Sequence, residues 1–111
     1  MNTFSYGARL NSFKLGLTED MGDPSLHLTL RLLSRAKSAG LSSMDLNFPD
    51  HFEGLTVSDL KRFTANHNID INGLAMRYYT APEFKLGAFT HPDARIRSLA
   101  IEKTKRGLDM A

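Results

Sequence analysis

The 111-residue sequence predicts an α/β fold in which three strand-then-helix units build a parallel sheet. Two observations lead to this prediction. Segments that alternate polar and apolar residues, as half-buried strands do, are each followed by a segment with apolar residues at helical spacing. Strands that alternate with helices along a chain are typical of right-handed βαβ crossovers, which make neighbouring strands parallel.

The first unit begins with a strand over residues 4–11, in which every second residue is apolar. After a loop rich in Gly and Asp, Pro24 suits the first turn of a helix, with Asp23 as its N-cap. Gly40 predicts the end of this helix. Its apolar positions recur at helical spacing: Leu28, Leu32, Leu33, Ala36 and Ala39.

The second unit starts with a short strand over residues 44–48, which again alternates apolar and polar side chains. Thr56 or Ser58 then caps a helix that runs towards Asn66 and Asn68, polar residues suited to a helix end. The helix carries a short apolar stripe made of Val57, Leu60 and Phe63.

The third unit consists of a strand over residues 71–78, a long loop with two Pro and one Gly, and a helix from about Ala94. The apolar stripe of this helix comprises Ile96, Leu99, Ala100 and Leu108. The basic run Lys103, Lys105 and Arg106 is interpreted as a solvated helix face, so no nucleic-acid partner is expected.

Three helices connected in this way can all cover one face of the sheet, as they do in a barrel, and leave the other face open. A full (β/α)8 barrel takes roughly 250 residues. We therefore expect residues 1–111 to form the N-terminal part of one domain: three βα units of a parallel (β/α)8 TIM barrel, an incomplete barrel.

Strand parity predicts a polar site at the carboxyl ends of the strands, where the active sites of barrels are built. If the apolar positions face the helices, one set of side chains faces a barrel interior: Arg9, Asn11, Asp45 and Asn47, followed on the third strand by Ala75, Arg77 and Tyr79. Any one polar residue at a strand end often only caps a loop, but several of the same parity favour a binding site. The two Arg side chains suit a sugar hydroxyl, a carboxylate or a phosphate.

Composition excludes several other classes of site. The chain has no Cys, so it has neither a thiolate nucleophile nor a disulfide, and its net charge is only +2. No run is apolar enough for a membrane helix and no secretory signal is seen, which makes the cytoplasm the expected location. The four His lack metal-site spacing. His51 is the one His considered for binding or proton transfer, with a loop-structuring role equally open.

Three stretches in order carry a resemblance to a known family: FSYGARLNSF, MDLNFPDHFEG and GLAMRYYTAPEFKLGAFTHPDARIRSLAIEKTKRGLD. They resemble the N-terminal part of xylose isomerase and its sugar isomerase/epimerase relatives. The third stretch is the most specific, because its loop residues fall in the order expected after the third strand of that family: Thr80, Pro82, Phe84, Lys85, Gly87, Phe89, Thr90 and Asp93. The residues that match on the following helix are Arg97, Ala100, Ile101 and Lys103.

The resemblance implies an enzyme that interconverts aldoses and ketoses, or epimerises ketoses, with a divalent metal (Mg, Mn or Co). In xylose isomerase a His at the end of the second strand and an Asp three residues later assist ring opening. Asn47 stands at the His position here and Asp50 at the Asp position. Arg9 replaces an aromatic residue of the sugar pocket, whereas Tyr79 keeps one. These departures favour a more polar or acidic sugar than xylose.

The expected roles follow from the parity and the resemblance together. Asp50 and His51 are the catalytic candidates, and the substrate-binding candidates are Arg9, Asn11, Asn47, Arg77 and Tyr79. The family's metal ligands come from later strands, so the complete family domain would bind the metal, whereas this chain is expected to bind none and to be inactive alone.

An alternative from another class is a non-catalytic barrel fragment or interaction module. Such a module would cover its open sheet face by forming a homo-oligomer or by pairing with a complementary barrel portion.

Overall fold

The computed structural model describes residues 4–14 and 25–111 of the chain. The chain divides into two compact units, Met1–Ala75 and Met76–Ala111, and each is described by itself.

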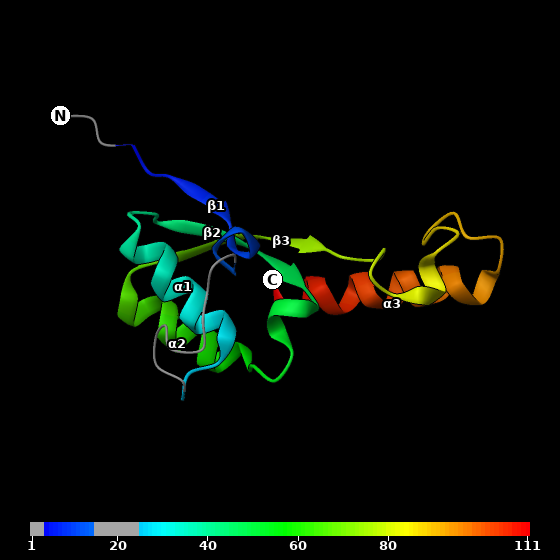
Figure 1. Ribbon diagram of the computed structural model, residues 1–111. Coiled ribbons are helices and arrows are strands. Elements are labelled where there is room, and N and C mark those ends of the chain that lie inside the picture. Colours follow the sequence, from blue (N-terminus) through cyan, green and yellow to red (C-terminus); the bar gives the residue numbers. More distant parts are fainter. Residues whose placement is uncertain (1–3, 15–24) are drawn as a thin grey trace. The chain divides into compact units, whose positions relative to one another are not determined.

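The first unit contains a three-stranded parallel sheet with two helices on one side of it (Figure 1). The strands lie in the order β1-β2-β3 and span Gly7–Arg9, Ser43–Phe48 and Asp70–Met76. The helices are α1, Leu28–Ser38, and α2, Val57–His67, and two short 3-10 helices, η1 and η2, span Leu10–Lys14 and Asp50–Phe52. The prediction of an α/β fold with parallel strands is confirmed, whereas membership of a barrel stays a prediction.

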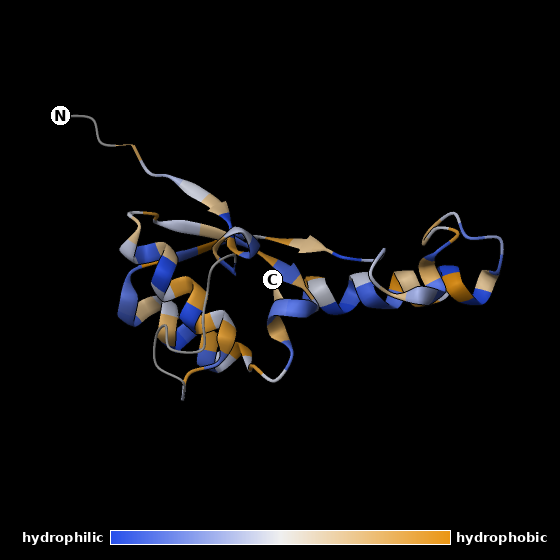
Figure 2. Cartoon of the chain, viewed as in Figure 1, coloured by the Kyte–Doolittle hydropathy of each residue, from blue (hydrophilic) through white to orange (hydrophobic). Residues whose placement is uncertain are grey.

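The core of this unit lies between the sheet and the two helices. Its largest fully buried apolar side chains are Leu10, Leu32, Leu33, Met44, Leu46 and Ile69. Burial of one such side chain contributes about 1.5–3 kcal/mol relative to leaving it in water. Hydrophobic and hydrophilic residues alternate around α1 and α2 in Figure 2, as expected of helices with one buried side.

The helix ends follow the chemistry of their capping residues. α2 begins as predicted, since the Thr56 hydroxyl accepts a hydrogen bond from the Asp59 amide at 3.0 Å, and it ends at Asn68 in the left-handed conformation. The prediction for the start of α1 is wrong. The Nδ1 atom of His27 caps this helix by accepting from the Thr29 amide at 3.1 Å. Asp23 and Pro24 lie outside the described residues.

The first strand is shorter than the predicted span of residues 4–11. Only Gly7–Arg9 pairs with β2, and the chain then turns into η1. This turn buries Leu10 completely, whereas Tyr6, predicted to face the helices, is 62% exposed. Asn11 consequently lies on η1 and has no strand parity.

The second unit consists of a loop with a short 3-10 helix, η3, Pro82–Phe84, followed by the long helix α3, Ala94–Met110. α3 begins where the sequence predicts. The Asp93 side chain accepts from the Arg95 amide at 2.9 Å and pairs with the Arg95 guanidinium, also at 2.9 Å. Hydrogen bonding from the Arg95 side chain is the main cause that lowers the pKa of Asp93 below its usual value, while the pKa of Arg95 is raised by the same bond.

The prediction that Lys103 belongs to a solvated basic face is wrong. This lysine is buried, its ammonium donates to the carbonyl of Arg77, and it lies 5.6 Å from the ring centres of both Tyr78 and Phe84. Tyr78 also packs edge-on against Phe84 and Phe89. The ammonium group of Lys103 thus helps to fasten α3 to the loop that precedes it.

Candidate functional site

Arg9 and Asn47 meet at the carboxyl ends of β1 and β2. The strand register pairs Ala8 with the buried Met44 and Arg9 with Asp45, so Arg9 and Asp45 share the sheet face that points away from α1 and α2. Asn47 has the same parity as Asp45. The Nη2 atom of Arg9 donates to the Oδ1 atom of Asn47 at 2.7 Å. The structure therefore brings together two of the predicted substrate-binding residues, here called the Arg9–Asn47 pair.

The backbone of Asn47 is held by a second hydrogen bond, separate from the one that its side chain makes to Arg9. Asn47 is only 2% exposed, and its backbone amide donates to the Nδ1 atom of His51 at 2.8 Å. His51 lies on η2, is buried, and uses its own carbonyl to accept from the Thr29 hydroxyl of α1 at 2.6 Å. A chain of hydrogen bonds thus runs from α1 through η2 to the Arg9–Asn47 pair.

This geometry bears on the two roles that the sequence left open for His51. Because Nδ1 accepts a backbone N–H, it carries no proton, and this nitrogen is already committed within the fold. The imidazole positions Asn47 and the turn η2. The hydrogen bond gives His51 a structural contact with β2, and its role in binding or proton transfer stays a prediction.

Asp50 and Asn11 lie on the two short 3-10 helices that follow β2 and β1. Asp50 is the first residue of η2 and is exposed. Asn11 is exposed on η1. Their predicted roles in catalysis and substrate binding remain predictions.

Arg77 and Tyr79 belong to the second unit and lie beyond β3, which ends at Met76 rather than at residue 78. The guanidinium carbon of Arg77 lies 5.0 Å from the ring centre of Tyr79, a cation–π arrangement. Tyr79 is 74% exposed, so its ring is open to solvent.

A further polar contact on the sheet joins Asp45 of β2 to β3. The Nδ2 atom of Asn72 donates to the Oδ1 atom of Asp45 at 3.1 Å. A side chain added at Gly73 would place its Cβ atom 3.5 Å from that same carboxylate oxygen, which shows how closely β3 passes Asp45. Sequence reasoning missed Asn72, because β3 was expected to contribute residues 75, 77 and 79.

The described side chains at this site offer hydrogen-bond donors and an acceptor. The Arg9–Asn47 pair offers guanidinium and amide N–H donors, and Asp45 offers a carboxylate acceptor. Across residues 4–14 and 25–111, no three His, Asp or Glu side chains come together in a way that would hold a metal ion. The described residues therefore do not fit the divalent metal that the family resemblance implies, and we assign them no metal-dependent step.

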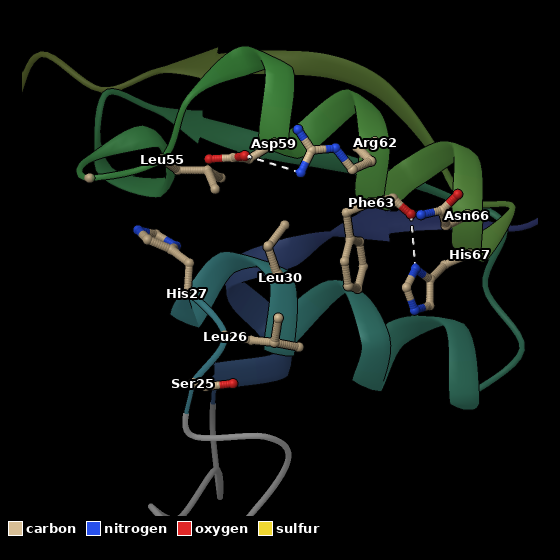
Figure 3. Close-up of a pocket in the computed structure, with 11 residues that line it drawn as sticks. Ser25, Leu26, His27, Leu30, Leu55, Asp59, Arg62, Phe63, Asn66 and His67 are labelled. Atoms are coloured by element: carbon tan, nitrogen blue, oxygen red, sulfur yellow. Dashed lines mark hydrogen bonds and ion pairs between the residues drawn. The ribbon is translucent and has the colours of Figure 1, made fainter.

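A separate groove of about 360 Å³ lies between α1 and α2 (Figure 3). Leu30 and Phe63 form part of its lining, with His27 near one end and His67 near the other. Both imidazoles are engaged: His27 Nε2 lies 2.5 Å from the Glu53 carbonyl, and His67 Nδ1 lies 2.9 Å from that of Phe63. None of the predicted site residues lines this groove.

Comparison with known proteins gave no match to a protein-family model, to a curated protein or to a solved structure. Among the helices of the described segments, none has both the length and the apolar character that crossing a membrane requires.

Proposed function

We propose that this chain contributes a sugar-binding wall to a cytoplasmic sugar isomerase or epimerase of the xylose isomerase-like class. In this proposal the Arg9–Asn47 pair binds and orients sugar hydroxyl groups. Hydrogen transfer between sugar carbons is assigned to no described residue.

The observation that supports the proposal is the position of the Arg9–Asn47 pair. It lies at the carboxyl ends of two adjacent parallel strands, on the face that points away from α1 and α2, and its two side chains are joined at 2.7 Å. Ligands of α/β proteins bind at this end of the strands. The N–H donors of Arg9 and Asn47 are fixed in place beside the Asp45 acceptor. This arrangement suits a polyol, because each of its hydroxyl groups can both donate and accept a hydrogen bond.

Nuclear magnetic resonance titration of the 111-residue chain tests the binding part of the proposal. D-xylose, D-xylulose and D-fructose are expected to shift the backbone amides of Arg9, Asp45 and Asn47, together with the Asn47 side-chain amide. R9M, which keeps the aliphatic stem but removes the donors, should abolish these shifts. R62M is the matched control, because Arg62 lies on α2, is exposed, and pairs only at 3.9 Å with Asp59.

The catalytic part of the proposal is tested with the same protein. With Mg²⁺, Mn²⁺ or Co²⁺ present, the chain alone is expected to leave an aldose unconverted. Turnover at a rate usual for sugar isomerases would show that these residues include the catalytic groups and that the assignment to a binding wall is wrong.

A second candidate function is supported by exposed apolar side chains in the second unit. They are Tyr79, Leu86, Phe89, Leu99, Ile101 and Leu108, with exposed fractions from 44% to 74%. Exposed apolar side chains that lie together mark an interaction surface. As an interaction module, the chain would form a homo-oligomer or pair with a complementary chain. Light scattering coupled to size-exclusion chromatography tests this: a dimer that L99S and L108S dissociate would support it, and a monomer at all concentrations would reject self-association.

A further inference from the structure

We infer that the Arg9–Asn47 pair selects a sugar that carries an anionic group, a carboxylate or a phosphate. This inference rests on the proposed function and narrows it to a substrate class. It depends on three properties of Arg9: the charge of its partner, the way in which its guanidinium is held, and its exposure.

The partner of Arg9 is neutral. Arg95 and Arg62 each face a carboxylate, from Asp93 at 2.9 Å and from Asp59 at 3.9 Å. Arg9 instead donates to the amide oxygen of Asn47, and within the described ranges it makes no ion pair. Its guanidinium is therefore held in place by a neutral partner rather than by an ion pair.

The guanidinium of Arg9 is also oriented before a ligand arrives. Its acceptor, Asn47, is 2% exposed and is fixed through its backbone amide to the buried ring of His51. Anchoring one nitrogen of the guanidinium reduces the side-chain entropy that a ligand would otherwise have to overcome. Arg9 itself is exposed, so the remaining donors of its fork are open to a ligand.

Residues next to Arg9 would bind the hydroxyl groups of the sugar. Asp45 lies opposite Arg9 in the register and accepts from Asn72 with one carboxylate oxygen. A carboxylate at this place accepts hydrogen bonds from hydroxyl groups but repels an anion. The anionic group is thus directed to Arg9 and the hydroxyl groups to Asp45, which defines the orientation of an acidic sugar.

Binding of three hexoses that differ only at carbon 6 distinguishes recognition of the anionic group from recognition of the sugar ring. They are D-glucose, D-glucuronate and D-glucose 6-phosphate. Charge-assisted hydrogen bonds are roughly twice as strong as neutral ones. We expect the dissociation constant of at least one anionic hexose to be tenfold or more below that of glucose, measured by titration of the Arg9 and Asn47 resonances. The difference should shrink at high salt. Comparison of the carboxylate with the phosphate identifies the anionic group.

Variants and simple anions complete the test. R9M should bring the three dissociation constants together, R9K should restore part of the preference, and R62M should leave it unchanged. If glucose binds the original chain as tightly as both anionic hexoses, the inference is wrong and the proposed sugar site stands. If inorganic phosphate or acetate binds as tightly as the matching hexose, the sugar function is wrong and only an anion site remains. If no probe shifts these resonances, both are wrong. The comparison of ligands on the original chain does not depend on the folding of any variant.

Discussion

Replacement of His51 by Phe tests whether this residue holds the candidate site together or takes part in chemistry. In the structure its Nδ1 atom is the acceptor for the Asn47 amide at 2.8 Å, and the ring is buried. Phe fills similar space but has no acceptor. H51F should therefore leave a buried N–H without its partner at the end of β2.

The expected cost follows from that single lost acceptor. A buried donor left unsatisfied destabilises a protein by about 1–3 kcal/mol. Since a tenfold change in an equilibrium constant corresponds to about 1.4 kcal/mol, the Asn47 amide should exchange its hydrogen roughly 5- to 150-fold faster in H51F. The midpoint of urea unfolding should fall as well, because the same bond is formed only in the folded state.

H51N is the matched control, because its Oδ1 atom stands as many bonds from the Cα atom as Nδ1 does. It retains an acceptor but loses part of the buried ring, so its unfolding midpoint should fall while the Asn47 amide keeps most of its protection. Equal protection of this amide in H51F and in the original chain would refute the reasoning, since the imidazole would then contribute nothing to holding Asn47.

Three further predictions concern other hydrogen bonds in the chain. T29V removes the buried hydroxyl that donates to η2 at 2.6 Å, and urea denaturation should show a loss of about 1–3 kcal/mol; an unchanged midpoint would mean that the hydroxyl contributes nothing. Because the pKa of Asp93 is lowered in the folded chain, its pairing with Arg95 stabilises α3 fully above the usual pKa of 3.8, and this contribution is lost as the pH falls through the lowered value. D93N should remove that acid dependence from the helical circular dichroism signal while keeping an oxygen to cap the helix; the same dependence in D93N would place its origin elsewhere. K103M keeps the apolar stem of Lys103 but loses the bond to the Arg77 carbonyl, so α3 amides should lose protection, whereas an unaltered exchange pattern would show that the ammonium is dispensable.

Much of the fold was predictable because the relevant signals are local. Alternation over residues 44–48 gave β2, and helical spacing with a Thr56 cap and Asn68 end gave α2. The start of α1 was not predictable in this way. His27 accepts from Thr29 and also lies 2.5 Å from the Glu53 carbonyl at Nε2, a contact 26 residues away that no local pattern reveals.

In the candidate site, too, some features could be predicted from local sequence patterns and others depend on the tertiary structure. Strand parity correctly put Arg9 and Asn47 on one face, because the register pairs Arg9 with Asp45. Parity failed for Asn11, since the chain leaves the strand at Leu10 in order to bury that side chain. The commitment of His51 to a backbone amide depends on how η2 folds back on β2, and this is a property of the tertiary structure rather than of spacing.

The short pairing of β1 with β2 has a consequence for the order in which the molecule assembles. The Arg9–Asn47 bond joins residues 38 positions apart, whereas the caps of α1 and α2 are formed by near neighbours. Contacts across a long loop carry a closure entropy before they gain any stabilisation, so we expect β1 to dock last during folding and to detach first on gentle destabilisation. A ligand held by Arg9 would then act as a clamp on the edge of the sheet, and its presence would be visible as slower hydrogen exchange in a strand of only three residues.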